Sequence, residues 1–391
     1  MGTAMSDSPA REAQQPPYSP GLEGVIAGES ALCLVDEGES GLLYRGYAIA
    51  DLAEYGTFEE VAHLLLFGHL PTHGELKSFS EQVIGQSLVP RPVEAFLNVM
   101  PQGAHQMDVL RTAVSILGMT DPDAGDSSRE ANIRKSIRLL AQMPLVISAA
   151  HRIASGTPLV SRRPDLSFAE NLLYLLTGRK GDDQANAMAH VLDVSLTLYA
   201  EHEFNASTFS ARVTASTMTD LHSAITSAIG TLKGPLHGGA NEAVAQMFVE
   251  IGNPDKAEGW VREALARKRR IMGFGHRVLK NGDARSAIIQ RHAAELSRIC
   301  GDRRWYEIAT VVEQVMREEK GLYPNLDFYT AAAYLLMAIP PALYTPVFVC
   351  SRITGWSAHV IEQQSHNRLM RPRALYTGPS KRGYLPLDRR T

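Results

Sequence analysis

Apolar residues recur with a helical period along most of the chain. Segment 109–117 is apolar at positions i, i+1, i+4, i+5 and i+8, which lie on one face of a helix. Segment 133–140 is apolar at i, i+4 and i+7 and is followed by Pro144, which we expect to kink or end its helix. No convincing alternation of apolar and polar residues follows residue 50. The pattern therefore predicts a mainly α-helical fold.

Polar residues at a fixed spacing mark where several helices begin. Thr57–Glu60, Thr72–Glu75 and Ser167–Glu170 each show the Ser/Thr-x-x-Glu signature of a capping box ahead of an apolar run. Gly68 follows the first of these runs, and we expect it to end that helix.

Before residue 50 the pattern is different. Segments 25–27, 32–35 and 42–44 are short and apolar, and glycines and acidic residues separate them. Such segments are typical of short strands, so we predict a few small β pieces near the N-terminus.

Glycines interrupt the helical pattern twice, near residue 235 and again at Gly321. Breaks of this kind are suited to hinges between domains. They predict a small helical domain of residues 233–332, inserted into a large helical domain made of residues 21–232 and 333–391.

Composition narrows the class of protein. Of the 391 residues, 45% are hydrophobic and 21% are charged, which is typical of soluble globular proteins. No run reaches the roughly 18 apolar residues of a membrane span. The formal net charge of −3 offers no general attraction for nucleic acid. Residues 1–20 contain four prolines, few apolar residues and no signal-peptide core, so we expect a mobile tail.

The three cysteines are Cys33, Cys300 and Cys350. An odd number at such wide spacing fits neither a disulfide framework nor a zinc ribbon. A reducing compartment is therefore expected, and we predict a cytoplasmic protein.

Three of the thirteen histidines lie in unusual surroundings. His237 and His276 are flanked by glycines, within segments 234–242 and 273–277, and His202 lies among polar residues in segment 201–207. Glycines allow the backbone to approach a ligand closely, and polar neighbours can select a histidine tautomer. Each could be an ordinary loop histidine, but their shared context predicts a common site.

Basic residues gather around His276. Segment 267–270 reads Arg-Lys-Arg-Arg, and Arg277 and Arg285 follow it. The run could be a solvated helix face, or it could bind the phosphates of a polyanion. Because the chain is negative overall, a small molecule that carries a nucleotide fits better than a nucleic acid. Segment 273–275 lacks the third glycine of a dinucleotide-binding fingerprint.

Two charged residues stand near the C-terminus in apolar surroundings. Asp327 could cap a helix or act as a general base in a partly apolar pocket. Arg352 lies within the apolar run 347–356 and should have an anionic partner, either from the protein or from a substrate.

Metal and cysteine chemistry are the first alternatives. Three histidines and an aspartate could form a hydrolytic zinc site. However, none of these histidines is paired at i, i+3 or i, i+4, and an HExxH motif is absent. No cysteine has the local signature of a nucleophile, and Cys350 lies in an apolar run. We therefore predict no metal site.

Four motifs together resemble citrate synthase, in the short bacterial and archaeal form that includes its sister 2-methylcitrate synthase. They are GPLHGGANE at 234–242, GFGHRVLKNGDAR at 273–285, PNLDF at 324–328 and SRITGW…RPR at 351–373. The resemblance extends over nearly the whole chain from about residue 21. It implies an almost all-α homodimer, in which a large and a small domain close over a cleft.

The resemblance also implies an acyltransferase reaction. Acetyl-CoA would condense with oxaloacetate, and the resulting citryl-CoA would be hydrolysed. Acetyl-CoA is a substrate here, and no metal or redox cofactor is implied. Asp327 corresponds to the base that removes a methyl proton, His237 to the donor for the thioester oxygen, and His276 to the group that polarises and protonates the oxaloacetate carbonyl.

Other residues correspond to binding groups. His202, Arg285 and Arg352 match the clamp on the oxaloacetate carboxylates, Phe348 an apolar wall beside it, and Arg371 an arginine that reaches the neighbouring subunit's site. Behind these, the resemblance places two supporting polar groups and a less certain CoA-binding set. The supporting polar groups are Asn205 and Ser207. The CoA-binding residues are Arg269, Arg270, Gly273, Phe274, Gly275 and Arg277.

Two alternatives stay open. Propionyl-CoA could replace acetyl-CoA, because one methylene changes binding by only about 1–3 kcal/mol; we place acetyl-CoA first. A non-catalytic protein that binds CoA or a dicarboxylate on the same fold would be expected to have lost Asp327, His237 or His276, and all three are present.

Overall fold

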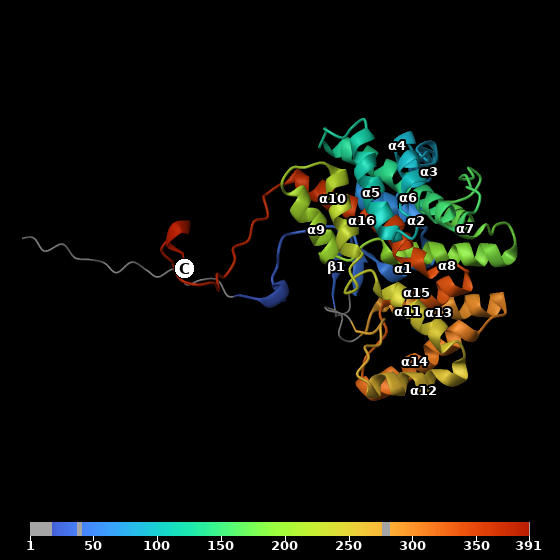
Figure 1. Cartoon of the computed structure of the whole chain (residues 1–391). Helices are drawn as coiled ribbons and strands as arrows, with labels where there is room; N and C mark the ends of the chain where they lie inside the picture. The colour runs from blue at the N-terminus through green and yellow to red at the C-terminus, as the bar shows by residue number, and fades with distance from the viewer. Residues whose placement is uncertain (1–17, 37–40, 276–281, 391) are drawn as a thin grey trace, which may run out of the picture. The chain divides into compact units, whose positions relative to one another are not determined.

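The computed structural model describes residues 18–36, 41–275 and 282–390 (Figure 1). It contains two compact units. One combines the two ends of the chain, Met1–Glu29 and Met370–Thr391, and the other is Ser30–Leu369. The second unit holds the helices and strands discussed below.

The mainly helical prediction is confirmed: within the described ranges the structure has sixteen α-helices and one small sheet. The helices of the first half are α1 (Ile49–Tyr55), α2 (Phe58–Phe67), α3 (His73–Gly85), α4 (Arg91–Val99), α5 (Gln106–Thr120), α6 (Arg129–Ser155), α7 (Phe168–Thr177) and α8 (Asp183–Tyr199). Those of the second half are α9 (Ala206–Ala215), α10 (Leu221–Leu232), α11 (Ala240–Ile251), α12 (Pro254–Ala266), α13 (Ala284–Cys300), α14 (Arg304–Lys320), α15 (Leu326–Leu336) and α16 (Tyr344–Ser365).

The sheet is antiparallel, in the order β1 (Cys33–Val35), β2 (Leu42–Tyr44) and β3 (Tyr47–Ala48). The predicted strands within 32–35 and 42–44 are confirmed. The predicted strand at 25–27 is wrong, because this segment is irregular and Ile26 is 91% exposed. A short apolar run becomes a strand only where a second strand and a core are available.

Local helix signals are accurate in this chain. The three predicted capping boxes are all formed, with each hydroxyl accepting from the N3 backbone and each glutamate accepting from the N-cap backbone. Gly68 ends α2 in the left-handed conformation, at a φ of 99°. Pro144, in contrast, does not end its helix: α6 continues to Ser155. Pro144 is buried, and α6 packs along α16, so tertiary packing outweighs the lost backbone hydrogen bond.

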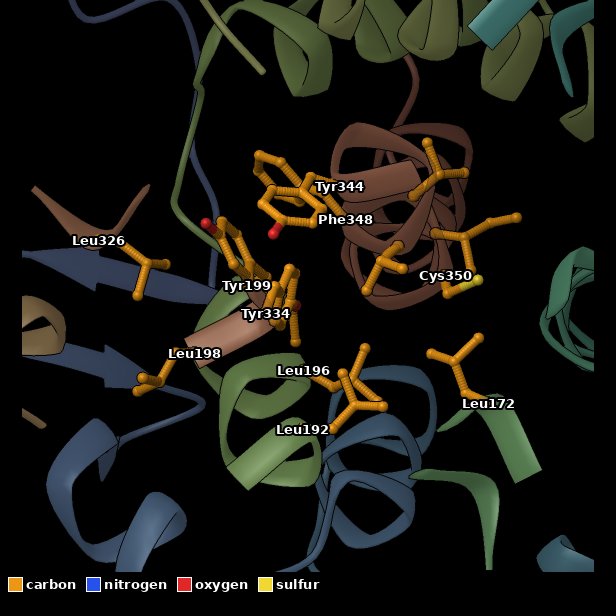
Figure 2. Packing of buried hydrophobic residues seen from close by; sticks show 14 of the residues in the cluster. Leu172, Leu192, Leu196, Leu198, Tyr199, Leu326, Tyr334, Tyr344, Phe348 and Cys350 are labelled. Atoms are coloured by element: carbon orange, nitrogen blue, oxygen red, sulfur yellow. The ribbon is translucent and has the colours of Figure 1, made fainter. Parts of the chain in front are cut away.

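Helix α16 is the centre of the core. It is buried along almost its whole length and packs against α6, α9, α10, α2 and α8. A helix that is apolar on all sides needs neighbours on all sides. Figure 2 shows its Phe348 and Cys350 among aromatic and aliphatic side chains, including Leu192 and Leu196 of α8. Arg352, which lies on this helix and is 2% exposed, is therefore almost completely removed from water.

Helices α11 to α15 pack mainly on one another, through the pairs α12–α14, α13–α15, α11–α15 and α14–α15. In Figure 1 α12 and α14 lie at the opposite end of this unit from α3 and α4. Contacts of α13 with α8 and of α11 with α16 join this group to the remaining helices. The division into domains at 233 and 332 stays a prediction.

Two carboxylates cap helices from a distance. Both oxygens of Asp193 on α8 accept from the backbone N–H of Phe58, at 3.2 and 3.1 Å, and Glu59 accepts from the N–H of Phe168 at 2.8 Å. Burial, and secondarily the negative charge of Glu59, raises the pKa of Asp193 to about 8.

This arrangement makes stability depend on pH. An unfolded aspartate has a pKa of about 3.9, so between pH 4 and 8 the folded state binds more protons and loses stability as the pH rises. Asp193→Asn keeps an acceptor for Phe58 and removes the charge. We expect the variant to match the wild type near pH 5 and to melt at a higher temperature at pH 9. Melting curves followed by circular dichroism test this, and parallel curves of melting temperature against pH would contradict it.

Candidate active site

The glycine-flanked segment lies beside the segment that carries Asp327. Phe274 and Pro324 form an isolated β-bridge, and the N–H of Asn325 donates to the carbonyl of Gly273 at 2.9 Å. Gly273 has a φ of +84°, and a Cβ there would lie 2.8 Å from the ring of Phe328, so only glycine fits this approach. Two segments that are fifty residues apart are thereby joined.

Asp327 is in the first turn of α15, but it does not cap this helix. The N-cap is Asn325, whose side-chain oxygen accepts from the N–H of Asp327 at 3.1 Å. The carboxylate of Asp327 instead accepts from the hydroxyl of Tyr199 at 2.6 Å. Asp327 is therefore available for chemistry, and the alternative of a simple helix cap is wrong.

Burial raises the pKa of Asp327 to about 6. The hydrogen bond from Tyr199 and the positive charges of Arg285 and Arg352 oppose this rise. At pH 7 the group is thus mostly ionised, and it is a stronger base than an exposed carboxylate. That is the state a general base needs.

Phe348 on α16 brings the other groups together. Its ring centre lies 4.2 Å from that of Tyr199 and 6.5 Å from that of His237, and the guanidinium of Arg352 lies 4.7 Å from it. Figure 2 shows Tyr199 and Phe348 facing each other beside α16. Through these rings Asp327, His237 and Arg352 share one region.

Hydrogen bonds orient the ring of His237. Its Nε2 lies 2.8 Å from Oγ of Ser207 and 3.4 Å from the backbone nitrogen of Ser207, and the indole N–H of Trp356 donates to the same Oγ. Burial, assisted by the charge of Arg352, lowers the pKa of His237 to about 4, so the ring is neutral at pH 7. A backbone nitrogen always carries its proton, so Nε2 accepts, and the ring proton is assigned to Nδ1. His237 can thus donate from Nδ1.

Two arginines supply positive charge inside the protein. Arg352 is 2% exposed, and its Nε donates to the carbonyl of Tyr199 at 2.6 Å. Burial lowers its pKa, and no carboxylate of the described residues forms an ion pair with it. Arg285, in contrast, makes two bonds to Asp283, at 3.0 and 2.8 Å, and is 5% exposed.

His202 follows the end of α8 and is 7% exposed. Its backbone N–H donates to Oε1 of Glu201 at 2.8 Å, and the same oxygen lies 2.9 Å from Nε2 of His359. Glu203, the next residue, has a φ of +54°, a strained value for a side chain of its size. Asn205 caps α9, and its side-chain oxygen lies 2.8 Å from Oγ of Ser207, so these two predicted supporting residues contact each other.

The predicted CoA-binding residues differ in their contacts. Arg269 makes two bonds to Glu250, at 3.0 and 2.9 Å, and lies over the ring of Trp260, whereas Arg270 is exposed. The ring of Phe274 is buried against Phe328, which leaves backbone groups as the contacts that segment 273–275 offers.

Some predicted residues cannot be placed. His276 and Arg277 lie outside the described residues. Arg371 belongs to the other unit of the chain. Within the part of the chain that is described, no three His, Cys, Asp or Glu side chains are grouped as metal ligands, and no helix is long and apolar enough to cross a membrane.

Sequence reasoning missed two residues of this region, Tyr199 and Asn241. Asn241 Nδ2 donates to the Tyr199 hydroxyl at 2.8 Å. A polar group at the end of an apolar helix, just ahead of the polar segment that begins at Glu201, was the available signal for Tyr199. Asn241 lies inside the quoted motif 234–242 but was given no role.

Comparison with known proteins places this site in context. The family model described as "Citrate synthase, C-terminal domain" matches residues 21–373. Citrate synthase 2 of Bacillus subtilis is 43% identical over 371 residues, covering 95% of this chain and 98% of that protein. The 2-methylcitrate synthase of Shewanella oneidensis is 44% identical over 373 residues, covering 95% and 97%.

Solved structures agree with these sequence matches. Citrate synthase from Thermotoga maritima superposes with a TM-score of 0.83 at 38% identity and covers 95% of this chain and 99% of its own. Citrate synthase from Thermoplasma acidophilum, solved as a ternary complex with carboxymethyl coenzyme A and oxaloacetate, has a TM-score of 0.88 at 33% identity and covers 96% of this chain and 100% of its own.

Because Arg352 forms no ion pair with a described carboxylate, its replacement should affect the melting temperature in a distinctive way. Arg352→Met removes a buried charge that forms no ion pair with a carboxylate of the described residues, so we expect an unliganded melting temperature at or above that of the wild type. A dicarboxylate such as oxaloacetate should raise the melting temperature of the wild type but not of the variant.

Arg212→Met is the matched control. Arg212 is also buried, but it pairs with Glu362 at 2.6 Å, so this variant should melt at a lower temperature. An Arg352→Met protein that melts as low as this control and still responds to the dicarboxylate would contradict the prediction.

Proposed function

The chain belongs to the citrate synthase family, and on that premise we propose that it is an acyltransferase that condenses acetyl-CoA with oxaloacetate and hydrolyses citryl-CoA to citrate and CoA. One observation carries the proposal. A half-buried carboxylate with a raised pKa, Asp327, shares a region with a neutral imidazole, His237, and with the buried Arg352.

The first step is removal of a methyl proton from the thioester. Asp327 accepts this proton as its carboxylate, and the electron pair moves onto the thioester oxygen. Nδ1–H of His237 donates to that oxygen as its negative charge develops. A neutral donor suits this task, because its N–H remains in place throughout the step.

The second step forms the carbon–carbon bond. The enol carbon attacks the ketone carbon of oxaloacetate, and the ketone oxygen takes up a proton. The family resemblance gives His276 the role of donating this proton. His202, Arg285 and Arg352 hold the two carboxylates of oxaloacetate, and Phe348 forms an apolar wall beside it. Guanidinium groups bind carboxylates through two hydrogen bonds, which suits a dicarboxylate substrate.

Hydrolysis completes the reaction. Water adds to the thioester carbonyl of citryl-CoA, the carbon–sulfur bond breaks, and CoA leaves as the thiol. Proton transfer and charge stabilisation supply the chemistry of all three steps, so we propose that neither a metal ion nor a redox cofactor takes part.

The remaining assignments complete the proposal. The enzyme is a cytoplasmic homodimer, each subunit has a large and a small domain that close over the cleft, and Arg371 enters the neighbouring subunit's site. Arg270 and the backbone of 273–275 bind CoA. Arg269, paired with Glu250, contributes by holding the segment that leads to them.

Propionyl-CoA is the alternative acyl donor. Relatives named citrate synthase and 2-methylcitrate synthase are 43% and 44% identical to this chain, so identity does not separate the two. The difference between the donors is one methylene, about 1–3 kcal/mol at most.

Release of free CoA tests the reaction. Purified protein should release thiol from acetyl-CoA only when oxaloacetate is present, and chelators should not reduce the rate. A parallel reaction with propionyl-CoA measures the preference as a ratio of kcat/KM, which we expect to favour acetyl-CoA. Thiol release without oxaloacetate, or activity only with added zinc, would contradict the proposed reaction.

Subunit mixing tests the role of Arg371. The Asp327→Ala protein lacks the proposed base, and the Arg371→Ala protein lacks a charged hydrogen bond to substrate that contributes about 1.5–3 kcal/mol, so each should be nearly inactive. In a mixed dimer, one site takes Asp327 from one chain and Arg371 from the other and is therefore intact. We expect up to about half the wild-type activity per mixed dimer. No recovery after exchange verified by mass spectrometry would place Arg371 outside the neighbour's site.

A further inference from the structure

The hydroxyl of Tyr199 lies between side chains from two other helices. It donates to Oδ1 of Asp327 on α15 at 2.6 Å, and Nδ2 of Asn241 on α11 donates to it at 2.8 Å. Tyr199 is 2% exposed and Asn241 is 1% exposed, so bulk water does not compete for these bonds. Three helices, α8, α11 and α15, thus meet at one phenolic oxygen.

The direction of each hydrogen bond follows from the chemistry. An ionised carboxylate only accepts, so the proton of Tyr199 points toward Asp327. The lone pairs of the phenolic oxygen then face Asn241, which must present its NH₂ group. Among the described residues, Oδ1 of Asn241 has no hydrogen-bond partner. A buried carbonyl without a partner costs stability, so the orientation of this amide serves the bond to Tyr199.

We propose that Tyr199 and Asn241 are positioning residues for Asp327: Asn241 directs the hydroxyl of Tyr199, and this hydroxyl holds the carboxylate in the orientation that accepts the substrate proton. The inference rests on the proposed function. With Oδ1 occupied by Tyr199, Oδ2 is the oxygen left to take the proton. Because Tyr199 comes from α8 and Asp327 from α15, the bond also joins the predicted large and small domains at the base.

The charged and titratable groups around Asp327 decide how it titrates. Arg285 and Asp283 face it from the start of α13, and Arg352 faces it from α16. Tyr334, on α15 itself, lies near enough to be affected by the charge of Asp327.

The remaining helices packed on α15 add little charge at Asp327. From α11 the contribution is the neutral Asn241, and Glu313 of α14 bonds to Tyr329. Loss of the Tyr199 hydroxyl leaves all these groups in place and removes one hydrogen bond to the ionised form. The pKa of Asp327 must then rise.

The test is the pH dependence of kcat in the full-length protein, with saturating acetyl-CoA and oxaloacetate. In Tyr199→Phe we expect the ascending limb of the curve of kcat against pH to move to higher pH by about one unit. The ratio of variant to wild-type kcat should then be about fivefold lower near pH 6 than at pH 8.5. The KM for oxaloacetate should not change, because the hydroxyl does not contact its proposed clamp.

Two further variants separate positioning from packing. Asn241→Leu should shift the limb in the same direction, and the double variant should shift it no further than Tyr199→Phe, because Asn241 acts through Tyr199. Tyr334→Phe is the matched control. It also removes a buried hydroxyl, one that lies 2.9 Å from Oγ of Ser195, and it should leave the limb in place.

An unshifted limb in Tyr199→Phe, or additive effects of the two substitutions, would overturn the inference, as would an equal loss at every pH. Titration of Asp327 by carbon-13 NMR of labelled aspartate, assigned by its loss in Asp327→Asn, tests the same contact without turnover. A wild-type protein that releases no CoA would overturn the proposed function, whereas an unshifted Asp327 titration would overturn the positioning role alone.

Discussion

A positive charge inside the most buried helix is the constraint on which the site depends. Arg352 belongs to α16, which packs against helices that include α6, α9, α10, α2 and α8, and no described carboxylate forms an ion pair with it. Its charge helps to keep His237 neutral and opposes the effect of burial on Asp327. Because a buried charge without an ion-pair partner is costly, this region is less stable than an apolar core of the same volume would be.

Backbone geometry places Asp327 and His237 near that charge. The bridge between Phe274 and Pro324 joins the glycine-rich segment to the start of α15, and Asn325 takes over the capping role there. The carboxylate of Asp327 therefore makes no capping bond and accepts from the hydroxyl of Tyr199 instead. On the opposite side, Ser207 at the start of α9 fixes the ring of His237.

Prediction from sequence succeeded where the cause is local. The three capping boxes and the end of α2 at Gly68 depend on residues within one turn of each other, and all were found. It failed where distant packing decides. Segment 25–27 has strand-like residues but no partner strand, and Pro144 remains within α6 because α16 supports that helix.

The sequence by itself determined the helical class, the helix starts and, through four motifs in order, the family and the set of candidate residues. Motifs record which residues are present but not their distances. Only the tertiary structure decided that Asp327 is not a helix cap, that Arg269 pairs with Glu250 whereas Arg352 forms no ion pair with a described carboxylate, and that Tyr199 contacts Asp327. The contact between Tyr199 and Asp327 joins residues 128 positions apart, and the burial of Arg352 depends on the helices that pack around α16, so no local pattern contains either of them.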